Sequence, residues 1–276
     1  MSSHGLNQMP PEQATNSLDR AFWVLDAIGN APGGLSNAEL SKELKIPKST
    51  CSFILSHLER AGYVKRLPTR RYCVGLRALL LANYALREIG FRASAESALH
   101  KLSKETNLLA SLCVLEGNHV LLIDRVESPK VLASLTENLP TVAYSYPFTR
   151  AARDVGAVVP IHASSLGRVL LAALPTERRR AILNSVPLVQ ITPETVVSIE
   201  ELLLELDLVK EQRYSITDQQ IHITGRGLAV PILDRDGIVR ASVGIAGSRD
   251  ETVWDDMESL LKKLRLAARS ISQTLI

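Results

Sequence analysis

The spacing of proline and glycine in the first quarter of the chain most constrains what it can fold into. The breaker Asn-Ala-Pro-Gly-Gly at 30–34 ends a helical pattern that runs from about Leu18 to Ile28 and for which Ser17 is the expected N-cap. Ser36 and Glu39 then form a Ser-x-x-Glu capping box at the start of a second helix, which ends near Lys45. The pattern predicts two short helices joined by a turn.

A third helix follows the tight turn Lys45-Ile46-Pro47, because proline suits the first helical position, where its missing N–H costs nothing. The spacing i, i+3, i+4, i+7 places four residues toward the core: Cys51, Ile54, Leu55 and Leu58. Four others then face outward: Ser49, Ser52, Phe53 and Ser56. The pair Ala61-Gly62 ends this helix.

Two strand patterns, 63–67 and 71–74, follow around a turn at 68–70. Two short helices, a turn, a third helix and a hairpin are the parts of a winged helix-turn-helix.

Positive charge is concentrated in this same region. Between Lys45 and Arg71 there are seven basic residues and one acid, a net charge of +6 in a chain of +3 overall. Residues 1–75 hold nine Lys or Arg and six Asp or Glu, whereas residues 76–276 hold 23 of each. This asymmetry is expected when one small domain meets a polyanion and the other does not. The alternative is a solvated charged hairpin on an ordinary α/β module.

The candidate DNA-binding residues lie on the third helix and the hairpin. Small hydroxyl side chains approach phosphates and base edges closely, Lys48 is placed to meet a phosphate, and the hairpin arginines follow the backbone or enter the minor groove. Phe53 touches thymine methyl groups or packs on a neighbour; both interpretations stay open. The candidates are Ser36, Lys48, Ser49, Thr50, Ser52, Phe53, Ser56, Lys65, Arg66, Arg70 and Arg71.

The segment 76–90 is apolar around most of its circumference, with leucines at 76, 79, 80, 81 and 86. A helix of this kind needs burial on more than one side. We therefore expect it to link two domains and to pair with a partner chain.

The rest of the chain alternates helical and strand patterns, which indicates an α+β fold whose C-terminal α/β domain has an antiparallel-rich sheet covered by helices on one side. The expected helices are 93–106, 165–174, 175–183, 199–212 and 251–275, and the expected strands are 109–115, 119–126, 131–135, 228–233 and 238–246. We divide the chain into a disordered tail (1–16), a winged helix-turn-helix domain (17–75), a linker or dimerisation helix (76–92) and an effector-binding domain (93–276).

The sequence carries no enzyme or metal signature. Three cysteines lack a C-x-x-C pair, and six scattered histidines show no ligand spacing. Gly225-Arg226-Gly227 begins like a dinucleotide motif, but Val230 replaces the third glycine. We expect no catalytic residue, no metal and no cofactor. No apolar run approaches the roughly 18 residues that span a bilayer, and the N-terminus lacks a signal core, so we expect a cytoplasmic protein with no membrane partner.

Several motifs in order resemble the IclR (isocitrate lyase regulator) family of bacterial transcription factors. They are Gly33-Gly34-Leu35-Ser36-x-x-Glu39-Leu40, Ile46-Pro47-Lys48-Ser49-Thr50, Leu58-Glu59-x-x-Gly62-Tyr63-Val64, Glu105-Thr106-Asn107, the run 122–128, the run 160–172 and Ala229-Val230-Pro231-Ile232. The resemblance covers roughly residues 17–275. It implies a homodimer or a dimer of dimers that binds a double-stranded DNA operator and senses a small organic acid.

In that family the ligand lies between the sheet and the start of the helix after the His-Ala motif. Backbone N–H groups at such a helix N-terminus suit a carboxylate. The resemblance implies an effector site made of Ser164, Ser165, Leu166, Asp218, Gly227, Leu228, Gly244 and Ala246. A buried histidine is more often a packing residue than a ligand, so we expect His162 to belong to the framework of the site.

Three of these positions, Gly227, Gly244 and Ala246, replace a common family pattern of Cys, Ser and Ser. We expect the lost side chains to leave room for a larger, less polar ligand, such as an aromatic or long-chain acid. The aromatic segment Tyr144–Phe148 is a candidate cover for it. The sequence thus predicts a regulator of a catabolic operon, with a metabolite-binding protein or an enzyme without DNA binding as the alternative. It names neither effector nor operator, and it does not distinguish repressor from activator or dimer from tetramer.

Overall fold

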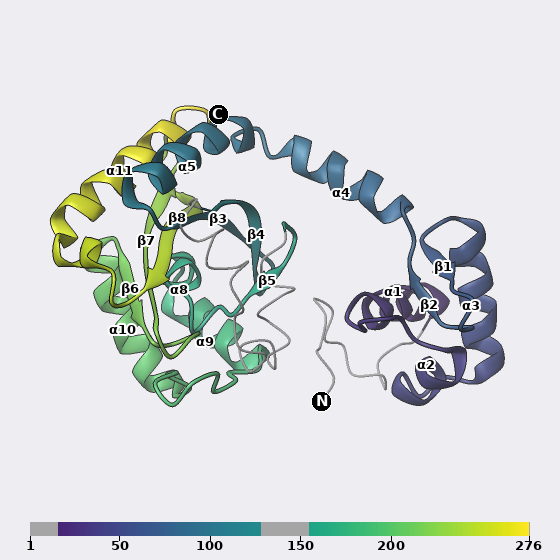
Figure 1. The fold of residues 1–276 in the computed structure, drawn as a ribbon. Coiled ribbons are helices and arrows are strands. Elements are labelled where there is room, and N and C mark those ends of the chain that lie inside the picture. Colours follow the sequence, from purple (N-terminus) through teal and green to yellow (C-terminus); the bar gives the residue numbers. More distant parts are fainter. Residues whose placement is uncertain (1–15, 128–154, 276) are drawn as a thin grey trace. The chain divides into compact units, whose positions relative to one another are not determined.

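The computed structural model describes residues 16–127 and 155–275, and the chain divides into two compact units with a boundary between Glu88 and Ile89 (Figure 1). The predicted strand 131–135 and the aromatic residues Tyr144, Tyr146 and Phe148 lie outside the described residues.

The first unit contains a three-helix cluster and a two-stranded hairpin. Its elements are α1 (Ser17–Gly29), α2 (Asn37–Glu43), α3 (Lys48–Arg60), β1 (Val64–Arg66), β2 (Tyr72–Val74) and α4 (Arg77–Glu88). The cap predicted at Ser17 is wrong by one residue, because the Asn16 side chain accepts the N–H groups of Leu18 and Asp19 and Ser17 is already helical. The capping box of Ser36 and Glu39 is present as predicted.

The core of the first unit lies between α1, α2 and α3. Its buried members are Val24, Ile28, Leu40, Ile46, Cys51, Ile54, Leu55 and Val64. The predicted inward face of the third helix is confirmed for Cys51, Ile54 and Leu55, and Leu58 is half-buried against the same cluster. Gly62, with φ +81°, turns the chain out of α3 into the hairpin.

The start of α4 is fastened to the end of α3. Gly75 donates its N–H to the carbonyl of Tyr63 at 2.7 Å, and Arg77 donates to the carbonyl of Gly62 at 3.3 Å. A Cβ on Gly75 would lie 2.2 Å from the Gly62 oxygen, so only glycine permits this approach. Apart from these contacts α4 is exposed to solvent, since none of its residues, all of which the structure describes, is buried.

The second unit is a curled six-stranded sheet with helices. Its elements are α5 (Arg92–Thr106), β3 (Leu109–Glu116), β4 (His119–Val126), β5 (Val158–Val159), α8 (Ser165–Ala172), α9 (Thr176–Ser185), α10 (Ile199–Gln212), β6 (Ser215–Asp218), β7 (Gly225–Leu233), β8 (Val239–Ser248), η3 (Thr252–Asp255) and α11 (Met257–Ser272). The strand order is β5-β4-β3-β8-β7-β6, and every neighbouring pair is antiparallel.

Helices cover both faces of this sheet, not one as expected (Figure 1). Helices α5 and α11 pack together and against β3, β4 and β7, while α8 packs against β3, β6, β7 and β8 from the other side. Alternation along β7 turns Gly227 and Ala229 toward α8, and Arg226, Leu228 and Val230 toward the other face. Helix α8 lies between the sheet and α10, which explains why almost all of its residues are buried.

Most predicted elements of the second unit are found near their expected positions, and 199–212 is matched residue for residue by α10. The short strands β5 and β6 were not predicted. The closing helix expected over 251–275 is divided, because the Asp256 carboxylate accepts the N–H of Ser259 and starts α11 after the single turn η3.

Candidate nucleic-acid interface and ligand site

The outward side of α3 presents the polar residues that the sequence predicted there. Lys48, Ser49, Ser52 and Ser56 are exposed, and Thr50 is half-buried. Pro47 occupies the N-cap and offers no side-chain hydrogen bond, so the first N–H groups of α3 stay available to an outside acceptor. An uncapped N-terminus beside a lysine suits a phosphate group.

The hairpin carries three freely exposed cations, Lys65, Arg66 and Arg70. The guanidinium of Arg66 lies 5.8 Å from the centre of the Tyr72 ring, which orients it along the hairpin. Arg70 stands at the turn with φ +60°. Because β1 packs against α3, these cations and the exposed hydroxyl side chains of α3 lie on neighbouring elements of the first unit.

Two predicted DNA-contacting residues have internal partners instead. The Arg71 guanidinium donates two hydrogen bonds to the Gly34 carbonyl, at 3.0 and 2.8 Å, and one to the Glu39 carboxylate at 3.1 Å. The Ser36 hydroxyl accepts the N–H of Glu39 in the capping box. The bonds of Arg71 hold the hairpin to the start of α2. The pKa of the Glu39 carboxyl lies below its ordinary value, chiefly because the backbone N–H of Ser36 donates a hydrogen bond to it.

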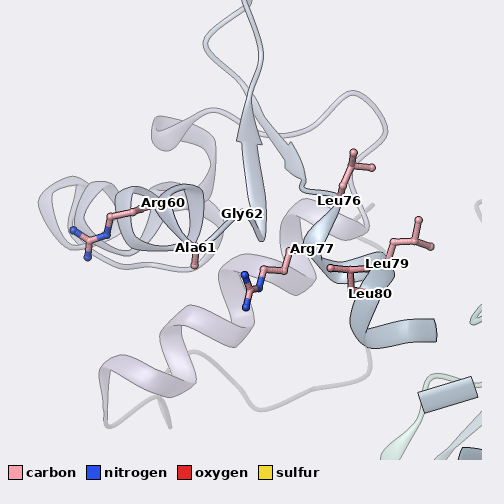
Figure 2. A pocket seen from close by; sticks show the side chains of 7 residues that line it. All are labelled: Arg60, Ala61, Gly62, Leu76, Arg77, Leu79 and Leu80. Atoms are coloured by element: carbon pink, nitrogen blue, oxygen red, sulfur yellow. The ribbon is translucent and has the colours of Figure 1, made fainter. Parts of the chain in front are cut away.

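A shallow groove between the end of α3 and the start of α4 brings leucines of the expected linker helix beside two arginines that the candidate DNA-binding residues did not include (Figure 2). Arg60 and Arg77 flank it, and Leu76, Leu79 and Leu80 supply its apolar part. Arg77 also lies 5.8 Å from the centre of the Tyr63 ring. The signal that could have found Arg60 is its helical position, because it falls on the same outward stripe of α3 as Ser49 and Ser56.

In the second unit the start of α8 offers the donors that the sequence predicted. Ser164 caps the helix, with its hydroxyl accepting the N–H of Gly167 at 3.0 Å. Within the described residues, the N–H groups of Ser165 and Leu166 donate to no acceptor. Two adjacent N–H groups at a helix N-terminus form a site for one carboxylate.

The sheet approaches this helix closely at Gly227 and Gly244. A Cβ on Gly227 would lie 3.0 Å from the hydroxyl oxygens of both Ser165 and Thr217, and a Cβ on Gly244 would lie 3.1 Å from Leu166 Cδ2. The expectation of extra room for a ligand beside the two glycines is therefore wrong for this structure, because side chains of α8 fill that space.

The register of β6 brings Thr217, which sequence reasoning missed, to the α8 side of the sheet. Thr217 pairs with Gly227, and Ser111 of β3 pairs with Gly244, so both hydroxyls share the face that carries Ala246. Knowledge of the β6 register was the missing signal, since one residue of shift exchanges the two faces of a strand.

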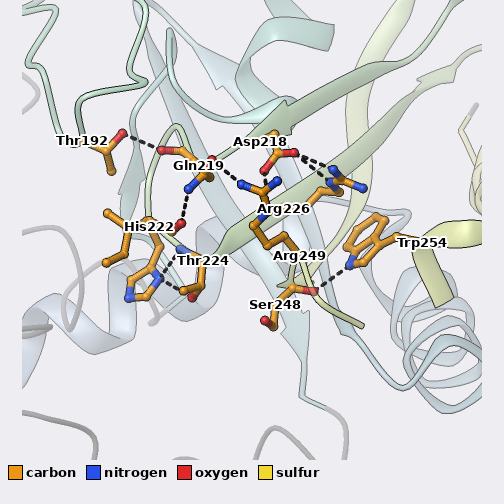
Figure 3. Close-up of polar contacts among 10 residues, drawn as sticks. Thr192, Asp218, Gln219, His222, Thr224, Arg226, Ser248, Arg249 and Trp254 are labelled. Carbon is orange, nitrogen blue, oxygen red and sulfur yellow. Dashed lines mark hydrogen bonds and ion pairs between the residues drawn. The ribbon is translucent and has the colours of Figure 1, made fainter. Parts of the chain in front are cut away.

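Asp218 lies on the opposite face, away from the start of α8. Its carboxylate pairs with Arg226 at 2.5 Å and with Arg249 at 3.8 Å (Figure 3), and Arg226 lies over the Trp254 ring. Leu228 is fully buried on that face as well. The structure thus separates these two predicted site residues from Ser165, Leu166, Gly227 and Gly244.

Buried polar side chains hold α8 in place. The Arg168 guanidinium donates to the His162 carbonyl at 2.7 Å and to the Gln220 side chain at 3.0 Å, and it pairs with Glu205 at 2.7 Å. His162 donates from Nε2 to the Val189 carbonyl at 3.0 Å, and burial lowers its pKa, which favours the neutral form of the ring. His162 is therefore a framework residue with an internal partner.

Across residues 16–127 and 155–275 no group of three or more His, Cys, Asp or Glu side chains could hold a metal ion. Among the helices of the described chain, none is long and apolar enough to cross a membrane. Burial raises the pKa of the Cys51 and Cys113 thiols, which makes them unreactive packing residues.

Comparison with known protein families matches both units. Residues 17–68 match the family described as "IclR helix-turn-helix domain", and residues 141–273 match "Bacterial transcriptional regulator IclR C-terminal". Together these matches cover well over half of the chain.

Full-length relatives agree with the domain matches. The transcriptional regulator KdgR of Dickeya chrysanthemi is 28% identical over 99% of this chain and 83% of its own. The Pca regulon regulatory protein of Pseudomonas putida is 27% identical over 91% of this chain and 81% of its own. A crystal structure of an IclR homologue from Microbacterium hydrocarbonoxydans, complexed with 4-hydroxybenzoate, is 26% identical, with a TM-score of 0.71 over 94% of this chain and 99% of that one.

Proposed function

The chain belongs to the IclR family of bacterial transcriptional regulators, and from this premise we propose that it controls a catabolic operon by binding an operator with its first unit and an organic-acid effector with its second. Its relatives are named as regulators, not as enzymes, in agreement with the prediction that it is not an enzyme. The protein acts in the cytoplasm as a homo-oligomer in this proposal.

The observation that carries the DNA-binding role is the surface made by α3 and the hairpin. It combines an uncapped helix N-terminus at Lys48, exposed hydroxyls on one helix face and the exposed cations Lys65, Arg66 and Arg70. Phosphate contacts from the lysine, the helix end and the hairpin position the unit, and the hydroxyl side chains of α3 meet base edges in the major groove. Arg71 and Ser36 support this surface from behind and are not themselves contacts.

Salt dependence of duplex binding tests this role. Each lost phosphate contact lowers the slope of log K against log salt by about 0.9. We expect Lys48→Ala and Arg70→Ala each to show this smaller slope when they bind DNA duplexes that were selected with the wild-type protein. Lys210→Ala, an exposed lysine on α10 in the other unit, is the matched control. A wild-type protein that ignores every duplex at 50 mM salt would reject the proposal.

The effector site lies at the start of α8 in this proposal. The N–H groups of Ser165 and Leu166 receive the carboxylate, and the Ser165 and Thr217 hydroxyls, which both lie next to Gly227, meet a second polar group. An aromatic acid is the favoured class, because a relative's structure contains 4-hydroxybenzoate and another relative is named for the pca regulon. Such a ligand requires Leu166 to move off Gly244, since it now fills that space.

A thermal-shift screen with carboxylic acids tests the effector class. A ligand at 100 times its Kd stabilises the native state by about 2.7 kcal/mol, which raises Tm measurably. We expect hydroxybenzoates to raise Tm and Thr217→Val to reduce the shift, with Thr224→Val, outside this face, as control. Tight binding of glyoxylate or pyruvate without binding of aromatic acids would eliminate the aromatic class but leave the regulator role intact.

A further inference from the structure

Two aromatic side chains occupy the outward stripe of α3 one helical turn apart. Phe53 is 61% exposed, although a phenylalanine ring gains free energy from burial. The ring of His57 lies against it, with 4.2 Å between the ring centres and planes tilted by 46°. His57 is exposed too, so the described chain covers neither ring from outside.

The hydrogen bonding of His57 fixes which of its nitrogens carries the proton. Nδ1 lies 2.9 Å from the Phe53 carbonyl oxygen, and a carbonyl only accepts, so Nδ1–H is the donor. In the neutral ring Nε2 is then left with a lone pair and accepts hydrogen bonds. The Ser56 hydroxyl donates to the same carbonyl at 2.8 Å, so its proton is likewise used within the helix. This patch therefore offers an apolar ring and, beside it, an acceptor nitrogen.

Few base edges in the major groove match that combination. Thymine presents a C5 methyl group, which suits an aromatic ring, whereas adenine N6 and cytosine N4 carry the amino groups that donate to an acceptor. The stripe that holds both rings also holds Ser49 and Ser56, which the proposed DNA contact already uses.

We infer that Phe53 and His57 act as one reading unit that selects a thymine and, beside it, a base with an exocyclic amino group in each half-site. This inference rests on the proposed DNA-binding function. It assigns to His57 a specificity role, and it resolves the two interpretations of Phe53 in favour of base contact.

Selection from a random duplex library with the full-length protein gives the first test. The wild-type consensus is expected to contain the thymine and an adjacent adenine or cytosine. His57→Arg carries donors only, so it should shift the second preference to guanine, which presents the acceptors O6 and N7. A shift at any other position, or no shift, would overturn the assignment of His57.

Chemically altered operators give the second test. Replacing the selected thymine by uracil removes one methyl group and should weaken wild-type binding about fourfold. Replacing the adjacent base by an analogue without its amino group should weaken binding about fivefold. The uracil effect should vanish in Phe53→Ala and the amino effect in His57→Ala, which a double-mutant cycle measures directly.

Controls separate this inference from the function on which it rests. His100→Ala, an exposed histidine on α5 of the other unit, should keep both effects. Phe53→Ala and His57→Ala should both melt like wild type, because the replaced side chains are exposed. If wild type and variants lose the same factor on every altered duplex, the pair reads no base and DNA binding itself stands. If wild type binds no duplex, both proposals fall together.

Discussion

At the scale of single residues, two adjacent arginines of the hairpin have different roles although the sequence makes them equivalent. Arg71 ties the hairpin to Gly34 and Glu39, whereas Arg70 points out from the turn. Arg71→Ala should lower the free energy of unfolding of the first unit by about 1–2 kcal/mol, since charge-assisted hydrogen bonds at a partly exposed site are lost. Arg70→Ala should change it by less than about 0.5 kcal/mol.

Urea unfolding followed by circular dichroism measures both variants. The same pair should show the reverse order in the salt slope of DNA binding, where Arg70→Ala has the direct effect. Equal stability of the two variants would show that the bonds of Arg71 contribute nothing to the fold.

His162 gives a residue-level prediction about pH. Burial lowers its pKa in the folded chain below the ordinary 6.5. Below pH 6.5 the unfolded chain therefore binds a proton that the folded chain does not, and the free energy of unfolding falls as pH falls, by at most about 1.4 kcal/mol per pH unit. His162→Gln does not titrate and should flatten the decline between pH 7.5 and 5.5. His100→Gln is the exposed control; parallel curves for all three proteins would contradict the burial effect.

At the scale of elements, the contact between α8 and the sheet depends on the absence of a side chain at Gly244. A Cβ there would lie 2.8 Å from the Leu228 carbonyl oxygen and 3.0 Å from Ala229 Cβ, both of which are fixed by strand pairing. Gly244→Ala should cost about 1–3 kcal/mol of stability through overpacking and displace the start of α8. Gly90→Ala is the matched control, because a Cβ added at Gly90 would have no neighbouring heavy atom within 4 Å, and it should be nearly neutral for stability.

The two variants are compared by chemical unfolding and by effector titration. If Gly244→Ala unfolds at the wild-type urea concentration, the helix is not held close to the sheet by this glycine.

Elements with strong local signals could be predicted from the sequence, and those defined by their partners could not. The capping box at Ser36 and the cap at Ser164 fix helix starts through bonds a few residues long. The strand β6 has four residues and acquires its register only from β7. That register places Thr217, and not Asp218, on the α8 side of the sheet, and the sequence pattern of so short a strand could not show this.

At the scale of the whole molecule, each unit has its own core, and the fastening of α4 to the end of α3 gives the linker helix a fixed direction within the first unit. A change in the orientation of α4 therefore moves α3 with it. The junction therefore couples the direction of α4 to the position of the candidate DNA-binding helix. Gly62 and Gly75 are the residues on which the fastening depends.

The exposed leucines of α4 carry the last prediction. Leu79 and Leu80 are 66% and 55% exposed, and a large leucine gains about 1.5–3 kcal/mol on full burial, so their exposure favours pairing with a second copy. Leu79→Gln with Leu80→Gln keeps good helix formers and removes no contact with a buried core.

This double variant should therefore melt like a folded monomer but sediment at half or less of the wild-type mass. A monomer meets one half-site at a time, so its operator affinity should fall more than tenfold, while binding of the effector is unchanged. Leu266→Gln on α11, 55% exposed in the other unit, should leave the mass and the affinity as they are. A double variant that remains oligomeric at nanomolar concentration would show that α4 does not hold the copies together.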